Sequence, residues 1–254
     1  MINTIWISTA HRTGSMWLFN VTRGIYRLVG RKVEPEDTPH SDEEMIQHAT
    51  QFAFTSQDQT KVWVLKVHTI LRPDLPRSKV LTTHRDPRDV FVSSKEFMKA
   101  NFDISLGCAR RVVSYTDAYK DYSPDYLMLV AYNDIETRPA NLIMEIAEFL
   151  NIPISEVDAK NLAVKFSRKN VKNIIAKSDK SLNKKLAKKK KIDHREIVCI
   201  SDSNYRAFDR KTGFQTGHVS QRKTGDWKKT LSKSEQQQLN DEFGSWLKEF
   251  GYEE

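Results

Sequence analysis

Residues 3–18 read NTIWISTAHRTGSMWL, and this stretch predicts a strand, a tight turn and the start of a helix. In Asn3–Thr9, Ile and Trp alternate with polar residues, which is the period of two expected of a strand. In Met16–Val29 the apolar residues return at helical spacing, at Leu18, Val21, Ile25 and Leu28. A strand that passes through a glycine-containing turn into a helix is the first half of a β-α-β unit.

The rest of the chain continues the alternation of strands and helices. Further strands are expected at Val62–Val67, Lys79–His84 and Tyr126–Tyr132, the last being a continuous apolar run typical of a central parallel strand. Helices are expected from Pro87 onward, at Cys108–Lys120, Pro139–Leu150 and Ser155–Phe166, and from the capping box of Ser232 and Glu235 to Gly251. This alternation predicts a single α/β domain over residues 1–254, with a mostly parallel central sheet flanked by helices.

The composition excludes several classes of protein. The chain has 254 residues, of which 39% are hydrophobic, so it can bury a core and is not disordered throughout. No apolar run approaches the roughly 20 residues of a membrane span, and the first residues lack a basic signal-peptide region. Two cysteines, Cys108 and Cys199, are too few for a disulfide framework. We therefore expect a cytoplasmic protein without membrane partners.

The net charge of +8 is local rather than general. Residues 160–191 contain 13 Lys and Arg and one acid, Asp179, so this segment carries +12 and leaves −4 for the rest. A solvated helix face with a mobile loop would account for it, and so would a field that attracts an anionic ligand or polymer. Nucleic acid is the weaker interpretation, because Lys184–Lys191 has no aromatic residues for base stacking.

The turn after the first strand has the composition of an oxyanion site. It places Gly14 between the hydroxyls of Thr13 and Ser15, at the point where helical N–H groups and the helix dipole favour negative charge. Arg12 adds a full positive charge. The turn is not a Walker A loop, which ends in Gly-Lys-Ser/Thr. An ordinary turn between a strand and a capped helix would also explain this pattern.

The ends of the next two expected strands also carry functional residue types. Lys66 and His68 lie two residues apart, hence on one face of the strand, and a nearby cation keeps an imidazole neutral and able to act as a base. A structural hydrogen-bonding role for the imidazole is the alternative. Arg85 precedes the helix that starts at Pro87, and with Ser93 it could bind a phosphate. Pairing of Arg85 with Asp89 across the helix start is the alternative.

Near the C-terminus, the segment from His218 to Lys228 combines adjacent cations, a glycine and an indole. It suits a flexible segment that folds over a charged nucleotide, although a surface loop anchored by Trp227 fits as well.

These four segments, in this order, resemble the cytosolic and bacterial sulfotransferases that use 3′-phosphoadenosine 5′-phosphosulfate (PAPS). Residues 12–18 are similar to the family's 5′-phosphosulfate loop, and Lys66-Val67-His68 is similar to the segment that carries its catalytic base. Residues 85–90 with Ser93 resemble its 3′-phosphate motif, and Gly225-Asp-Trp-Lys228 resembles its C-terminal cofactor loop. Tyr132, expected to end the fourth strand, resembles the tyrosine near the adenine.

The resemblance implies a three-layer fold like that of the P-loop NTPases. It also implies a PAPS donor, the bisphosphate PAP as product and no metal. It implies a small acceptor with a hydroxyl or an amine. The implied catalytic residues are His68, Lys66 and Arg12. The implied cofactor-binding residues are Arg12, Thr13, Gly14, Ser15, Met16, Trp17, Arg85, Ser93, Tyr132, Arg222, Lys223, Thr224 and Gly225.

The chain departs from the family pattern at several positions. Arg12 replaces a lysine of the phosphosulfate loop, and it keeps the charge but cannot donate a proton as an acid would. Met16 replaces a threonine and removes one hydroxyl from the loop. Residues 31–60 and 160–195 have no counterpart, and we expect them to be acceptor-side or mobile excursions. The acidic content of residues 34–44 hints weakly at a cationic or polar acceptor, and a solvated loop explains it better.

Two other functions fit parts of the sequence. One is a P-loop kinase-like phosphotransferase, which lacks its Walker A lysine and an evident Mg²⁺ carboxylate here. The other is a noncatalytic nucleotide- or polyanion-binding protein that uses residues 160–191 as its contact surface. The sequence gives no indication of the oligomeric state.

Overall fold

A parallel five-stranded sheet forms the centre of the described chain. The computed structural model describes residues 3–54, 58–72, 75, 77–201, 204–220 and 222–252. Within these ranges the strand order is β2-β3-β1-β4-β5, and each neighbouring pair is parallel. The bounds are β1 Thr4–Ser8, β2 Lys32–Glu34, β3 Lys61–Val67, β4 Ser78–His84 and β5 Leu127–Ala131.

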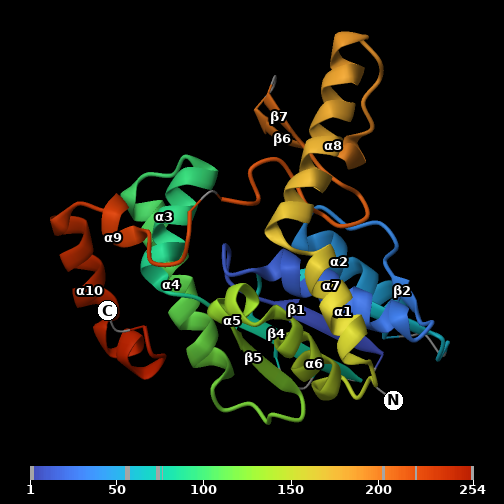
Figure 1. Cartoon of the computed structure of the whole chain (residues 1–254), viewed down its shortest axis with the longest axis horizontal. Coiled ribbons are helices and arrows are strands. Elements are labelled where there is room, and N and C mark those ends of the chain that lie inside the picture. The colour runs from blue at the N-terminus through green and yellow to red at the C-terminus, as the bar shows by residue number, and fades with distance from the viewer. Residues whose placement is uncertain are drawn as a thin grey trace.

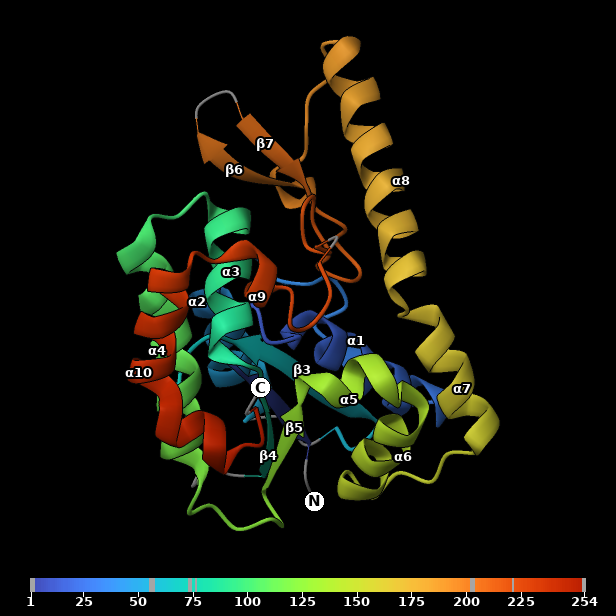
Figure 2. The same cartoon turned by 60° about the vertical axis from the view of Figure 1, so that its left-hand side comes forward.

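Helices cover both faces of this sheet. One layer contains α1 (Ser15–Leu28), α6 (Pro139–Phe149) and α7 (Glu156–Lys165), and the other contains α3 (Pro87–Met98), α4 (Phe102–Tyr119) and α10 (Lys233–Glu249) (Figures 1 and 2). The three layers confirm the predicted α/β class. Shorter helices are α2 (Asp42–His48), the π-helical turn Ala49–Ala53, α5 (Tyr132–Thr137) and α9 (Trp227–Thr230).

The register of the sheet brings the ends of three strands together. β1 pairs with β3 on one side and with β4 on the other, with Ile5 opposite both Val64 and Lys79. All five residues of β1 are buried, as expected of a central parallel strand. Because parallel strands end at one edge, the segments that follow β1, β3 and β4 meet there.

Local sequence signals set the helix starts. Ser232 accepts a hydrogen bond from the Glu235 N–H and the Glu235 carboxylate accepts one from the Ser232 N–H, so the predicted capping box is confirmed. The helix expected at Cys108–Lys120 begins earlier, at Phe102, because the Asn101 side chain accepts a hydrogen bond from the Ile104 N–H.

A buried arginine fixes two loops to the first helix. Arg23 is fully buried in α1. Its guanidinium donates hydrogen bonds to the carbonyls of Pro35, Glu36 and Lys211. The loop after β2 and the loop around residue 211 are thus held against the helix that begins at the glycine turn.

The expected central position of Tyr126–Tyr132 is wrong. β5 lies at an edge of the sheet, and Leu129 is 39% exposed. An apolar run reports packing against the two faces and cannot report how many strands pair with the segment, which explains the error. Tyr132 also begins α5 instead of ending the strand.

Two strand regions were missed by the sequence patterns. The excursion at residues 31–60 contains α2 and the π-helical turn as well as β2, which is only three residues long. The second region is an antiparallel hairpin of β6 (Ile197–Ser201) and β7 (Asn204–Ala207). The 3₁₀ turn His194–Glu196 precedes it. Segments this short show too few repeats of the strand period to be recognised.

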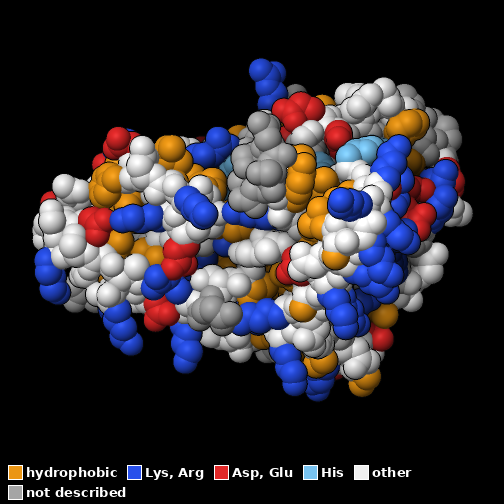
Figure 3. Space-filling model, turned by 90° about the horizontal axis from the view of Figure 1, so that it is seen from above, with side chains coloured by type: hydrophobic (Ala, Val, Ile, Leu, Met, Phe, Trp, Pro, Cys, Tyr) orange, Lys and Arg blue, Asp and Glu red, His pale blue; other side chains and the backbone are white. Residues whose placement is uncertain are grey.

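The basic segment is helical over most of its length. α8 (Arg168–Ala187) follows α7, with Ser167 as its N-cap, and buries Val171, Ile175 and Leu182. This agrees with the helix face that the sequence allowed for this segment. The far end of α8 projects beyond the three layers beside the β6–β7 hairpin (Figures 1 and 2). Lys and Arg side chains gather over this region (Figure 3).

Within the described ranges, no helix combines the length and apolar character needed to cross a bilayer. Cys108 and Cys199 are both free thiols.

Candidate functional site

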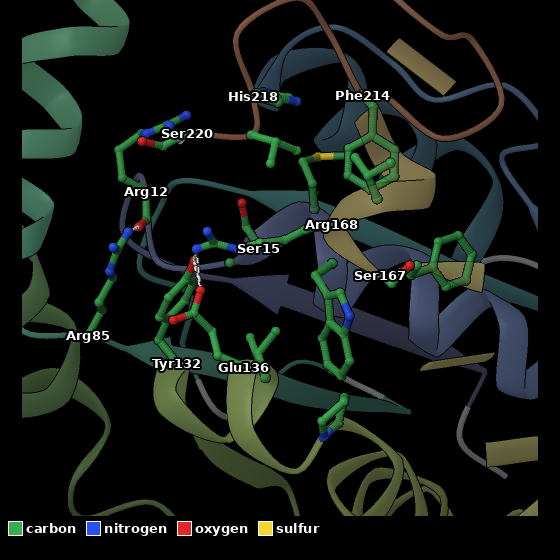
Figure 4. Close-up of a pocket in the computed structure, with 18 of the residues that line it drawn as sticks. Arg12, Ser15, Arg85, Tyr132, Glu136, Ser167, Arg168, Phe214, His218 and Ser220 are labelled. Atoms are coloured by element: carbon green, nitrogen blue, oxygen red, sulfur yellow. Dashed lines mark hydrogen bonds and ion pairs between the residues drawn. The ribbon is translucent and has the colours of Figure 1, made fainter. Parts of the chain in front are cut away.

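A cavity of about 530 Å³ opens at the carboxyl edge of the sheet (Figure 4). Its walls come from the turn between β1 and α1, the starts of α3 and α5, the α7–α8 junction and the loop at residues 214–223. Nine of the predicted site residues line it. They are Arg12, Gly14, Ser15, Met16, Trp17, Arg85, Ser93, Tyr132 and Lys223.

The glycine turn requires its glycine. Gly14 has a φ of 96°, a left-handed conformation that side chains disfavour. A Cβ atom there would lie 2.8 Å from Ile135 Cδ1 and 3.1 Å from Tyr132 Cδ2. Gly14 is also the N-cap of α1 and caps it with no side chain. The N–H groups of the first turn, from Ser15 onward, therefore remain available to an anion at the cavity wall.

Two arginines from different strand ends meet on one side of the cavity (Figure 4). Arg12 Nε donates a hydrogen bond to Ser93 Oγ at 2.9 Å, and Arg85 Nη1 donates one to the Arg12 carbonyl at 3.0 Å. The Arg85 guanidinium lies 4.1 Å from the centre of the Tyr132 ring. Burial, followed by the charge of Arg85, lowers the pKa of Arg12 to about 10. Two guanidinium groups this close favour an anion between or beside them.

The ion pair between Arg85 and Asp89, the alternative role considered for Arg85, is long. Arg85 Nη2 lies 3.9 Å from Asp89 Oδ2. The same carboxylate accepts a hydrogen bond from the Gly225 N–H at 2.9 Å. Burial raises the pKa of Asp89. Arg85 Nε is buried and has no hydrogen-bond partner among the described residues. Asp89 thus anchors the C-terminal loop, and Arg85 keeps a donor for a ligand.

Glu136 accepts hydrogen bonds from three side chains at the cavity. Its carboxylate accepts hydrogen bonds from Arg168, from Thr224 Oγ1 at 2.6 Å and from the Tyr132 hydroxyl at 3.3 Å. The hydroxyl of Thr224 is therefore directed at a protein carboxylate. Arg222 forms an ion pair with Glu96 and does not line the cavity.

Thr13 faces the protein interior. Its fully buried hydroxyl donates to the Ala10 carbonyl at 2.7 Å and lies 2.6 Å from Thr83 Oγ1 on β4. The side chain fixes the turn to the neighbouring strand, and it does not line the cavity.

Lys66 and His68 form a pair at the end of β3. His68 Nδ1 lies 2.8 Å from the Thr9 carbonyl, which can only accept, so Nδ1 carries the proton. Lys66 Nζ lies 3.1 Å from His68 Nε2. Asp42 accepts a hydrogen bond from the His68 backbone N–H at 2.6 Å, and the ring of His11 stacks on the imidazole at 3.8 Å. Neither member of the pair lines the cavity.

Burial and the neighbouring charges keep the imidazoles of His68 and His11 neutral. Burial, followed by the charge of Lys66, lowers the pKa of His68 well below its usual value. Burial and Lys66 also lower the pKa of His11 to about 4. Burial lowers the pKa of Lys66 to about 8. At neutral pH the pair is therefore an unprotonated Nε2 beside a cation, which can accept a proton and stabilise a developing negative charge.

The sequence matches the family model of the sulfotransferase domain over residues 3–251. The chain belongs to the sulfotransferase domain family. No curated protein sequence matches it. Two solved structures have the same fold. One is retinol dehydratase in complex with retinol and PAP, with a TM-score of 0.62, 16% identity and coverage of 96% of this chain and 81% of that chain.

The other is mouse sulfotransferase SULT7A1 in complex with PAP. Its TM-score is 0.62 at 14% identity, with coverage of 96% of this chain and 84% of that chain. Both alignments agree with the predicted three-layer sulfotransferase fold, and the family match confirms the resemblance seen in the motifs.

Several residues that line the cavity of this sulfotransferase were not identified from the sequence. They are Ile135, Glu136, Pro139, Ala163, Phe166, Ser167, Arg168, Val171, Phe214, His218, Val219 and Ser220. Five of them lie in α5, α7 and α8, whose helical patterns carry no sign of a site. His218 had a signal, since it is the first residue of the C-terminal segment from His218 to Lys228. Its Nδ1 accepts a hydrogen bond from the Gln215 N–H at 3.1 Å.

No group of three or more His, Cys, Asp or Glu side chains suited to a metal ion occurs in the described part of this sulfotransferase.

Proposed function

We propose that this sulfotransferase transfers the sulfonate of PAPS to a hydroxyl or amine of a small acceptor, with His68 as the general base. The observation that carries the proposal is the convergence of Arg12 and Arg85 on one cavity, joined by Ser93 and by the free N–H groups of the glycine turn. Several anion-binding groups beside aromatic walls suit a nucleotide with phosphates at two positions.

The residues of the cavity fit such a donor. Its volume of about 530 Å³ lies within the range of nucleotide-sized pockets. The unpartnered Nε of Arg85, with Ser93 and Lys223, would hold the 3′-phosphate. Arg12, Ser15 and the backbone of the turn would hold the 5′-phosphosulfate. The aromatic side chains Trp17, Tyr132 and Phe166 supply apolar surface for the adenine.

The chemistry assigned to each residue follows from its charge state. When bound, PAPS supplies a sulfonate whose S–O bond to the 5′-phosphate breaks as the bond to the acceptor forms. His68 Nε2 takes the acceptor's proton, which its lowered pKa leaves it free to do at neutral pH. Lys66 turns from Nε2 toward the charge that develops on the leaving oxygen, and Arg12 stabilises the same charge.

Two measurements test this function. In a thermal-shift experiment, PAP should stabilise the protein, whereas ATP with Mg²⁺ and heparin should not. Stabilisation by ATP with Mg²⁺ alone would support the kinase-like alternative, and stabilisation by heparin alone would support a polyanion-binding protein.

The second measurement follows ³⁵S from PAPS into a panel of phenols and amines. The variant His68→Ala should bind PAP as tightly as the unmodified protein and turn over about 10²–10⁴-fold more slowly. His194→Ala is the matched control, because His194 is exposed. Turnover of the His68 variant at the control's rate would remove the assigned base.

A further inference from the structure

Arg206 is a cation of the β6–β7 hairpin that lies close to the donor cavity. Its Cζ lies 4.1 Å from the centre of the Phe97 ring, and it donates a hydrogen bond to the Phe97 carbonyl. Arg12 Cζ lies 4.2 Å from the same ring centre. The Cζ atoms of Arg12 and Arg206 are therefore no more than 8.3 Å apart.

Among the residues that the structure describes, none is a counterion for Arg206. Within the described ranges no carboxylate forms an ion pair with it, and the Phe97 carbonyl is the only hydrogen-bond acceptor found for its five N–H donors. Partial burial lowers its pKa, and its charge contributes to lowering the pKa of Arg12. A half-buried guanidinium with free donors is an arrangement that an anion would complete.

His218 connects this cation to the reacting end of the site. The His218 ring lines the donor cavity and stacks on Phe97, with ring centres 5.6 Å apart and an angle of 24° between the planes. Burial, followed by the charges of Arg12, Lys66 and Arg206, lowers the pKa of His218 to about 3. Arg206 and Lys66 thus both act electrostatically on His218. Arg206 does not itself line the donor cavity, so it is not among the residues that would hold the nucleotide.

Three acidic side chains of residues 34–44 already have partners within the protein. Glu36 pairs with Lys211, and Asp37 pairs with Arg210. Asp42 accepts hydrogen bonds from the His68 N–H and from the Thr69 hydroxyl. None of these three carboxylates is therefore free to bind the cationic acceptor that residues 34–44 weakly suggested. The field near Lys66 and His68 is instead positive.

We propose that the acceptor carries an anionic group, a carboxylate, sulfate or phosphate, besides its nucleophilic hydroxyl or amine, and that Arg206 binds this group. The side chain of Phe97 supplies the apolar surface beside it. The guanidinium fork matches such oxyanions, and opposite charge would select them over neutral analogues of the same shape. The inference rests on the proposed function, because it places the acceptor beside Lys66 and His68.

Three phenols of one shape test the inference: 4-hydroxyphenylacetate, its neutral amide, and the cation tyramine. Their kcat/KM values are compared with PAPS as donor, and their affinities are measured for the PAP-loaded protein. The unmodified protein should prefer the carboxylate to the amide by about 10-fold or more, since one hydrogen bond to a charged group supplies such a factor. Tyramine should be the poorest of the three.

The variant Arg206→Gln should abolish this order while leaving the Kd for PAP unchanged. Arg206→Lys should keep part of the preference, and Arg110→Gln, which removes an exposed arginine paired with Glu242, should keep all of it. Equal affinity of the unmodified protein for all three phenols, or binding of none, overturns the inference. So does an equal loss for all three phenols in Arg206→Gln.

The two proposals fail in distinguishable ways. If PAP binds and sulfonate is transferred to other acceptors without regard to their charge, only the inference on Arg206 is wrong. If PAP does not bind at all, the proposed function is wrong and the inference falls with it.

Discussion

Replacing Arg85 by Met should weaken the binding of PAP far more than the binding of adenosine 5′-monophosphate. The Arg85 side chain is only 9% exposed, so solvent screens its charge little. Hydrogen bonds to charged groups contribute about 1.5–3 kcal/mol each, and a guanidinium that holds a phosphate through two of them contributes about 3–5 kcal/mol. This corresponds to an increase of about 10²–10³-fold in Kd for PAP, allowing for the charge of Lys223 on the same cavity.

Part of the loss is common to both nucleotides. Arg85 also donates a hydrogen bond to the Arg12 carbonyl at 3.0 Å and so supports the glycine turn. Removing that bond costs about 1 kcal/mol, or about fivefold in affinity, whichever nucleotide is bound. The rest of the loss is specific to PAP, because adenosine 5′-monophosphate has no 3′-phosphate.

Isothermal titration of both nucleotides into both proteins yields the difference directly. Arg88→Met is the matched control, because Arg88 is equally buried but bonds Asp86 and the Tyr252 carbonyl and does not line the cavity. The control should lower the melting temperature without changing the preference for PAP. If Arg85→Met weakens both nucleotides by the same factor, Arg85 does not recognise the 3′-phosphate.

Three further outcomes are expected. Burial lowers the pKa of Lys66 to about 8, so its protonated fraction, and with it kcat, should fall as the pH rises through that value; Lys66→Arg should remove the fall below about pH 10. A wild-type rate that is flat to pH 9 would contradict this role. Gly14→Ala should weaken PAP binding by about 10-fold or more in titrations, because its Cβ would clash with Ile135 at 2.8 Å; unchanged affinity would show that the turn does not need glycine. Arg23→Met should lower the melting temperature by about 6–12 °C in calorimetry, since loss of a fully buried, multiply bonded arginine costs about 3 kcal/mol. A decrease under about 2 °C would indicate that water replaces its bonds.

The sequence predicted those parts of the site that depend on local chemistry. The turn at Gly14 and the proline-started helix after Arg85 each follow from a few adjacent residues, and both are present. Their convergence also followed from sequence, because strands that alternate with helices pair in parallel and end at one edge.

The remaining parts depend on contacts between distant segments. Thr13 turns inward because Thr83, seventy residues away, stands beside it on the neighbouring strand. The far cavity wall, including Phe166, comes from helices whose apolar spacing is the same whether they face a core or a ligand. The position of His68 beside Lys66 was predictable from spacing, whereas its stacking on His11 required the path of the turn.

Arg23 has a consequence for how this protein could diversify. It holds two surface loops mainly by their main-chain oxygens, at Pro35, Glu36 and Lys211, with one further bond to the Thr38 hydroxyl. Every amino acid has such an oxygen, so substitutions in these loops can alter their exposed side chains without altering the path they follow. One inward-facing cation thus separates the course of two loops from their surface chemistry, while the glycine turn on the same helix stays in place.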